Sequence, residues 1–137
     1  MNVEGQINTW ISNAFQAGAS DLHFEPEKGD KVRVRMRLDG MLKSIDTVSG
    51  NKQILSRLKV MAELDINDKG AALDGRINAA KHIPGCPGLD IRVSTLPCMN
   101  GEKVVLRLID SRRLNMKLED LGFTKKMLSL YEPQVKS

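Results

Sequence analysis

The sequence has few aromatic residues, few cysteines and few histidines. One Trp, one Tyr and three Phe make up 4% of its 137 residues, so we expect a core built from Leu, Ile, Val and Met. Its two cysteines, Cys86 and Cys98, lie in proline-flanked loops on either side of a predicted strand. They could approach each other, but we expect free thiols because nothing in the sequence marks the chain for export. His82 lies near Cys86 but His23 is remote, so the sequence predicts no metal site.

Long apolar runs and known phosphate-binding loops are also missing. No apolar run reaches the length that a bilayer-spanning helix needs. Residues 1–5 have neither the basic region nor the apolar region of a signal peptide, so we expect no export signal there. The sequence contains no Gly-x-x-x-x-Gly-Lys-Ser/Thr, no Gly-x-Gly-x-x-Gly and no Gly-x-Ser-x-Gly. The residues alone therefore predict neither a phosphate-cradling loop of known pattern nor a serine nucleophile.

What the sequence does contain is a series of helix and strand patterns that suits one domain. The length of 137 residues is typical of a single domain, and the formal charge of +4 is compatible with an acidic or phosphate-bearing partner. Periodicity predicts, in order, a helix at 3–17, strands at 19–26, 31–38 and 41–45, a helix capped at 49–51 with its buried stripe at 54–62, strands at 76–80, 89–95 and 103–109, and helical turns at 118–123 and 124–131. Arg57 and Lys59 are expected on the outer sides of the second helix. This order favours an α+β fold with a mostly antiparallel sheet of about six strands and flanking helices.

The first predicted strand alternates polar and apolar residues. Asp21, His23 and Glu25 point one way, whereas Leu22 and Phe24 point the other. The polar trio could serve in acid–base chemistry, but a solvated strand face would carry the same residues. A histidine between two carboxylates is expected to have its charged form favoured.

The second predicted strand has a basic face made of Lys31, Arg33, Arg35 and Arg37. Such a face could contact nucleic acid. No aromatic residue is interleaved among the basic ones, so the strand offers no platform for stacking bases. A solvated face or a protein interface is the more common role for such a stripe, and we expect no nucleic-acid partner.

Two arginines stand out on the last pair of predicted strands. If Thr95 faces Glu102 across the connecting loop, Arg92 and Arg107 emerge on the same face as diagonal neighbours. Two guanidinium groups held on rigid strands suit a phosphate or a carboxylate ligand. The alternative is structural, because in this register Asp90 lies opposite Arg107 as a ready ion-pair partner.

Five blocks together closely resemble one protein family. They are Ala-Ser-Asp-Leu-His-Phe-Glu-Pro (19–26), Val-Arg-Met-Arg-Leu-Asp-Gly (34–40), Ser-Arg-Leu-Lys-Val-Met-Ala-Glu-Leu-Asp-Ile (56–66), Asp-Gly-Arg (74–76), and Arg-Val-Ser-Thr-Leu-Pro with Gly-Glu-Lys-Val-Val-Leu-Arg-Leu (92–97 and 101–108). The set resembles the N-terminal domain that precedes the motor domain in the ATPases of type II secretion and type IV pilus assembly. One departure is that Ala72-Leu73 stands where the family usually has Pro-Gln before Asp-Gly-Arg.

The resemblance implies a PAS-like domain at 1–113 and, at 114–137, the start of a linker towards a RecA-like motor domain. It implies a cytoplasmic homo-hexamer at the inner membrane, whose partners are platform proteins and the motor domains of the same and neighbouring chains. ATP and Mg²⁺ would be bound by the motor domain, so this chain is expected to hold neither cofactor and to hydrolyse nothing alone. The family arginines that reach the γ-phosphate correspond to Arg92 and Arg107, which implies catalytic and nucleotide-binding roles for both. A PAS-like interaction module without nucleotide contact stays open as an alternative.

Overall fold

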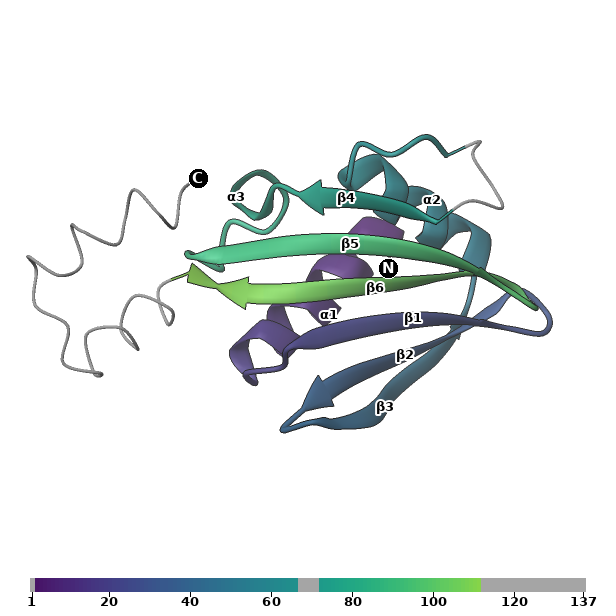
Figure 1. Ribbon diagram of the computed structural model, residues 1–137, viewed down its shortest axis with the longest axis horizontal. Helices are drawn as coiled ribbons and strands as arrows, with labels where there is room; N and C mark the ends of the chain where they lie inside the picture. Colours follow the sequence, from purple (N-terminus) through teal and green to yellow (C-terminus); the bar gives the residue numbers. More distant parts are fainter. Residues whose placement is uncertain (1, 67–71, 112–137) are drawn as a thin grey trace, which may run out of the picture.

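The computed structural model describes residues 2–66 and 72–111, which form one antiparallel sheet with helices on one side (Figure 1). The elements are, in order, α1 (Val3–Gln16), β1 (Asp21–Glu27), β2 (Lys31–Leu38), β3 (Met41–Ser49), α2 (Asn51–Met61), β4 (Leu73–Ile77), α3 (Ala79–His82), β5 (Leu89–Cys98) and β6 (Gly101–Asp110). The six strands of this described part lie in the order β3-β2-β1-β6-β5-β4, and every neighbouring pair is antiparallel. The predicted α+β class with about six mostly antiparallel strands is confirmed.

The apolar core lies between the sheet and the two longer helices, α1 and α2. Figure 1 shows both helices behind the sheet, and no described element covers the face in front. Each strand sends its alternate apolar residues towards the helices, as Leu22, Phe24 and Leu106 do. The rings of Trp10 on α1 and Phe24 on β1 meet edge to face at 5.8 Å. As the composition predicts, Leu, Ile, Val and Met supply most of this core.

The first helix begins and ends where its sequence provides caps. The side chain of Asn2 accepts a hydrogen bond from the backbone N–H of Gly5, which satisfies one free donor of the first turn. After Ala17, Gly18 takes a left-handed backbone conformation (φ 83°), as expected of the residue that stops a helix. The helix predicted at 3–17 is thus confirmed to within a residue.

The hairpin between β5 and β6 is tighter than the sequence suggested. Cys98 pairs with Gly101, so only two residues form the turn, and both strands run up to it through Pro97 opposite Glu102. Thr95 consequently faces Val104, and the predicted pairing of Thr95 with Glu102 is wrong by two residues. A shift of two residues leaves every side chain on its predicted face.

The second helix carries a buried charge that its helical pattern did not reveal. Lys59, expected on an outer side of the helix, is 2% exposed, and its Nζ lies 2.9 Å from Glu102 Oε1 on β6. The expectation for Lys59 is wrong because β6 provides a carboxylate on the apolar face of the sheet, which allows an ammonium to be buried in an ion pair. The predicted apolar stripe of this helix is buried as expected, with Ile54, Leu58 and Met61 in the core.

Several element boundaries also differ from prediction. β3 continues to Ser49, and β4 begins at Leu73 rather than at 76. The short helix α3 was missed. The cap expected from residues 49–51 is instead supplied by Asp30, whose side chain accepts from the backbone N–H of Lys52 at 3.1 Å. The turns predicted at 118–131 and the domain boundary at 113 lie outside the described residues.

Candidate functional site: an arginine row on the open face of the sheet

The two arginines predicted to share a face do share one. Arg92 on β5 lies directly opposite Arg107 on β6, so they are closer than the diagonal neighbours that the predicted register gave. Both belong to the face away from α1 and α2, because their strand neighbours Val93, Leu106 and Leu108 are buried in the core. The side chain of Arg92 is 56% exposed and that of Arg107 is 68% exposed. A ligand on this side of the sheet can therefore reach both guanidinium groups.

These two arginines are the middle of a longer row that crosses five strands. In backbone register, Arg37 on β2 faces Asp21 on β1, Asp21 faces Arg107, Arg107 faces Arg92, and Arg92 faces Arg76 on β4. We call these five residues the arginine row. Three arginines stand side by side on β6, β5 and β4, and like charges directly opposite each other destabilise a sheet. A local rule broken in this way is expected at functional sites.

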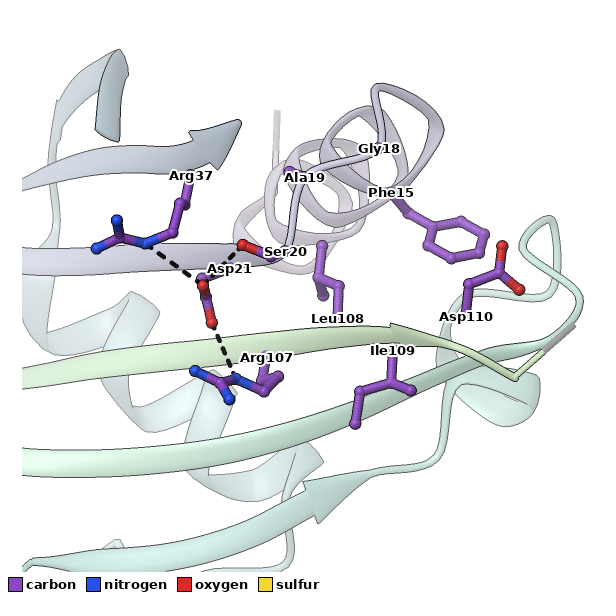
Figure 2. Close-up of a pocket in the computed structure, with 10 residues that line it drawn as sticks. All are labelled: Phe15, Gly18, Ala19, Ser20, Asp21, Arg37, Arg107, Leu108, Ile109 and Asp110. Carbon is purple, nitrogen blue, oxygen red and sulfur yellow. Dashed lines mark hydrogen bonds and ion pairs between the residues drawn. The ribbon is translucent and has the colours of Figure 1, made fainter. Parts of the chain in front are cut away.

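Asp21 is the buried centre of one half of the row (Figure 2). It is 5% exposed although it lies on the open face, where Arg37 and Arg107 contact it from the two neighbouring strands. Its Oδ1 accepts a hydrogen bond from Arg107 Nε at 3.2 Å, and its Oδ2 lies 3.6 Å from Arg37 Nε and accepts from the Ser20 hydroxyl at 2.9 Å. Arg37 also donates from Nη1 to the carbonyl of Gly40.

Asp90, which lies beside the arginine row, likewise contacts two of its arginines, Arg76 and Arg92. It precedes Arg92 by two residues on β5, and its carboxylate lies 2.9 Å from Arg76 Nε and 3.5 Å from Arg92 Nε. It faces Ile109 across the sheet, so the predicted pairing of Asp90 with Arg107 is wrong. The Asp90 side chain is 23% exposed, compared with 7% for Asp21, so the second carboxylate is the more hydrated one.

An open pocket of about 890 Å³ borders the row at Asp21, Arg37 and Arg107. Its other lining residues come from the end of α1, the turn into β1 and the end of β6. Figure 2 shows Phe15 and Asp110 on the side of the pocket away from the arginines. The pocket thus places two guanidinium groups beside a solvent-accessible space.

His23 lies two residues after Asp21 on β1, on the same face of the sheet. It is not the charged group that the sequence suggested. Burial lowers the pKa of His23, and Lys103 adds to that effect, while Asp21 and Glu25 act in the opposite direction. The expectation of a favoured charged form is wrong because desolvation and nearby cations outweigh the two carboxylates. His23 is 7% exposed, and its Nδ1 has no hydrogen-bond partner in the described part of the chain.

The basic stripe of β2 is paired with the acidic residues of β1. Arg33 lies 3.6 Å from Glu27, Arg35 lies 3.3 Å from Glu25, and Arg37 contacts Asp21 as described above. Lys103 on β6 also approaches Glu25, at 3.4 Å. Much of the positive charge that could attract a nucleic acid is thus offset by carboxylates on the neighbouring strand.

Sequence reasoning missed three members of the row: Asp21 as a shared partner, Arg37 and Arg76. Alternation correctly placed Asp21 and Arg37 on the polar faces of their strands. Alternation could not show that β1 lies next to β6, a pairing between residues at least eighty positions apart. Periodicity within a strand carries no information about such neighbours.

Cysteines, possible metal ligands and possible membrane-spanning helices can be located within the described residues. Cys86 is buried and Cys98 is exposed, and both are free thiols, as predicted. Across residues 2–66 and 72–111, no three His, Cys, Asp or Glu side chains come together as metal ligands would. In that same part of the chain, no helix is long and apolar enough to cross a membrane.

Comparisons with known proteins match all or most of the chain. The family described as "Type II/IV secretion system protein" matches residues 1–137. The chain is 40% identical over 128 residues to the type IV pilus assembly ATPase PilB of Pseudomonas aeruginosa, covering 91% of this chain and 22% of that protein. It is 42% identical over 122 residues to a putative type II secretion system protein E of Escherichia coli, covering 86% of this chain and 24% of that protein. The type II secretion system ATPase E of Vibrio cholerae is 40% identical over 121 residues, covering 86% of this chain and 23% of that protein.

The chain thus spans about a quarter of the length of these relatives. The family match, over residues 1–137, includes all the segments that build the sheet and the arginine row. Because the family match covers the full chain, and because the relatives from both machineries agree with it, the chain belongs to the type II/IV secretion system protein family.

Proposed function

We propose that this chain is the nucleotide-contacting, PAS-like domain of a hexameric ATPase that powers type II secretion or type IV pilus assembly. The observation that carries the proposal is the direct opposition of Arg92 and Arg107 on the open face, with both side chains more than half exposed. Adjacent guanidinium groups on rigid strands suit the oxygens of a phosphate better than any single exposed arginine does.

In this proposal the nucleotide and its Mg²⁺ are bound by a RecA-like motor domain, joined through residues 114–137 or provided by a neighbouring subunit. The chain fits that division of labour. It has arginines to offer to a phosphate, but no phosphate-cradling loop in its sequence. Arg92 and Arg107 stabilise the charge that develops on the transferring phosphoryl group, the usual task of arginines in phosphoryl transfer. This chain alone hydrolyses no ATP.

The same contacts couple hydrolysis to motion. Both arginines belong to central strands of one continuous sheet, so a phosphate held by them is connected to the whole domain. Loss of the γ-phosphate removes that contact and lets the domain swing against the motor. In the cell, the hexamer lies in the cytoplasm against the inner-membrane platform of the secretion or pilus machine.

The test is ATP turnover by a full-length protein that carries this domain joined to its motor domain. Arg92→Ala and Arg107→Ala are each expected to lower kcat by about 10³-fold, the lower end of what arginine fingers contribute. Arg33→Ala is the matched control, because Arg33 lies on the same face in an exposed ion pair two strands away from Arg107. Unchanged turnover in both variants would show that the arginines hold only a protein interface, which is the alternative role of a PAS-like module.

A further inference from the structure

We infer that Asp21 and Asp90 are positioning residues, which hold the guanidinium groups of Arg107 and Arg92 so that their terminal nitrogens face outward. This inference rests on the proposed function, since it names the residues that prepare the phosphate-contacting arginines. Each aspartate contacts two arginines of the row, so every one of its four arginines lies in an ion pair with one of the two carboxylates.

The geometry of the contacts is the first argument. In all four pairs the nitrogen closest to the carboxylate is Nε, at 3.2 Å for Arg107, 3.5 Å for Arg92, 2.9 Å for Arg76 and 3.6 Å for Arg37. Among the described residues, Arg92 and Arg107 make their ion-pair contacts through Nε, and no hydrogen bond from either Nη is found. A guanidinium group has five donors in a rigid plane, so fixing Nε orients the two Nη groups without using them.

Electrostatics supplies the second argument. Arg76, Arg92 and Arg107 are direct neighbours across three strands, and without counter-charges they would turn away from one another. Asp21 lies at one end of this trio, and Asp90 lies between Arg76 and Arg92. The carboxylates therefore let the arginines stay together, as binding of one phosphate by two guanidinium groups requires.

The two aspartates differ in burial, and this difference indicates which of them has the larger effect. Asp21 is 5% exposed and also accepts a hydrogen bond from Ser20, so its carboxylate has a fixed orientation. A partly buried ion pair is screened less by salt than an exposed one. Asp90 is more hydrated and contacts Arg92 at a longer distance. We therefore expect Asp21 to have the larger influence on turnover.

The test is a double-mutant cycle on ATP turnover in the full-length protein with its motor domain. Asp21→Asn is expected to lower kcat/KM by about tenfold, because a reacting group misplaced by 1 Å can lose about 100-fold in rate. In the Arg107→Gln background the same substitution is expected to change kcat/KM less than twofold, since its effect acts through Arg107. Glu27→Gln is the matched control, because Glu27 pairs with Arg33 through Nε on the same face.

The outcomes separate the two proposals. An equal loss for Asp21→Asn in both backgrounds would mark Asp21 as merely structural, and no loss at all would also overturn the inference. If neither Arg107→Gln nor Arg92→Gln changes turnover, it is the proposed function that fails. If Asp21→Asn does not fold, Asp90→Asn with Arg92→Gln provides the second cycle, with a smaller expected loss.

A second readout is independent of turnover. In the 137-residue chain labelled with ¹⁵N, the Nε–H of Arg107 is expected to exchange with water more slowly than that of Arg33. The Asp21→Asn substitution should remove this protection, and Glu27→Gln should leave it intact. Equal exchange for Arg107 and Arg33 in the unsubstituted chain would contradict the positioning role.

Discussion

The two faces of the sheet use ion pairs in opposite ways. On the covered face, Lys59 and Glu102 meet at 2.9 Å and are both nearly inaccessible to solvent. On the open face, the carboxylate of Asp21 is buried, whereas Arg107, which it contacts, is two-thirds exposed. The first pair satisfies charges that no ligand can reach. The second leaves one side of a cation available, so burial of the acid and exposure of the base distinguish the proposed binding site from the structural pair.

The largest expected effect concerns the covered pair. Glu102→Gln removes the carboxylate that lies 2.9 Å from the buried Lys59 ammonium, so we expect the free energy of unfolding to fall by about 3–5 kcal/mol. Chemical denaturation of the 137-residue chain measures this loss. Replacing both residues together, as Lys59→Met with Glu102→Leu, should recover much of it, because an apolar pair needs no compensation. A double variant as unstable as the single one would show that the pair stabilises the fold in another way.

Neighbouring residues on β6 sharpen the comparison of the two faces. Leu106 is fully buried, and Leu106→Ala should lower the free energy of unfolding by about 2–5 kcal/mol through lost burial and a cavity. Arg107→Ala, one residue further along, should lower it by about 1 kcal/mol or less, because the arginine is mostly exposed and Asp21 keeps Arg37 and Ser20 as partners. The same denaturation curves check both values. Equal losses at the two positions would mean that the arginine is needed for folding.

The smallest effect is a dependence of stability on pH that arises on the open face. Because burial lowers the pKa of His23, the unfolded chain binds a proton more readily than the folded chain does as the pH falls below about 6.5. Stability is therefore complete above the unfolded pKa and is lost as the pH falls towards the folded one. Burial lowers the pKa of His82 as well, so it contributes in the same direction.

Thermal unfolding between about pH 7.5 and pH 5 measures this dependence. His23→Gln should flatten the curve and leave the part due to His82, whereas His82→Gln should leave the part due to His23. A curve that stays equally steep in the His23 variant would show that the buried ring is not the cause.

Sequence predicted the faces of the strands better than it predicted their neighbours. The alternation in β1, β2 and β5 is local, so the faces of Asp21, Arg37 and Arg92 could be read from a few residues. The register of β5 with β6 depends on the length of one turn, and it was wrong by two residues because Pro97 reads as a loop residue. Since two is the period of a strand, that error did not move the arginines to the other face.

Contacts between distant segments could not be predicted in this way. The pairing of Asp21 with Arg107 depends on β1 lying beside β6. The burial of Lys59 depends on a carboxylate more than forty residues away. Both facts follow from the order of strands in the sheet and from how α2 packs on it. Periodicity alone does not determine either of them.

A structure of this domain joined to its motor domain, with Mg²⁺ and a non-hydrolysable ATP analogue bound, tests the central claim most directly. The account predicts that Nη groups of Arg92 and Arg107 lie within hydrogen-bonding distance of the γ-phosphate, about 2.7–2.9 Å for charge-assisted contacts, while Nε of Arg107 stays on Asp21. A γ-phosphate remote from both side chains, with the arginines bound to carboxylates of the motor domain, would contradict it.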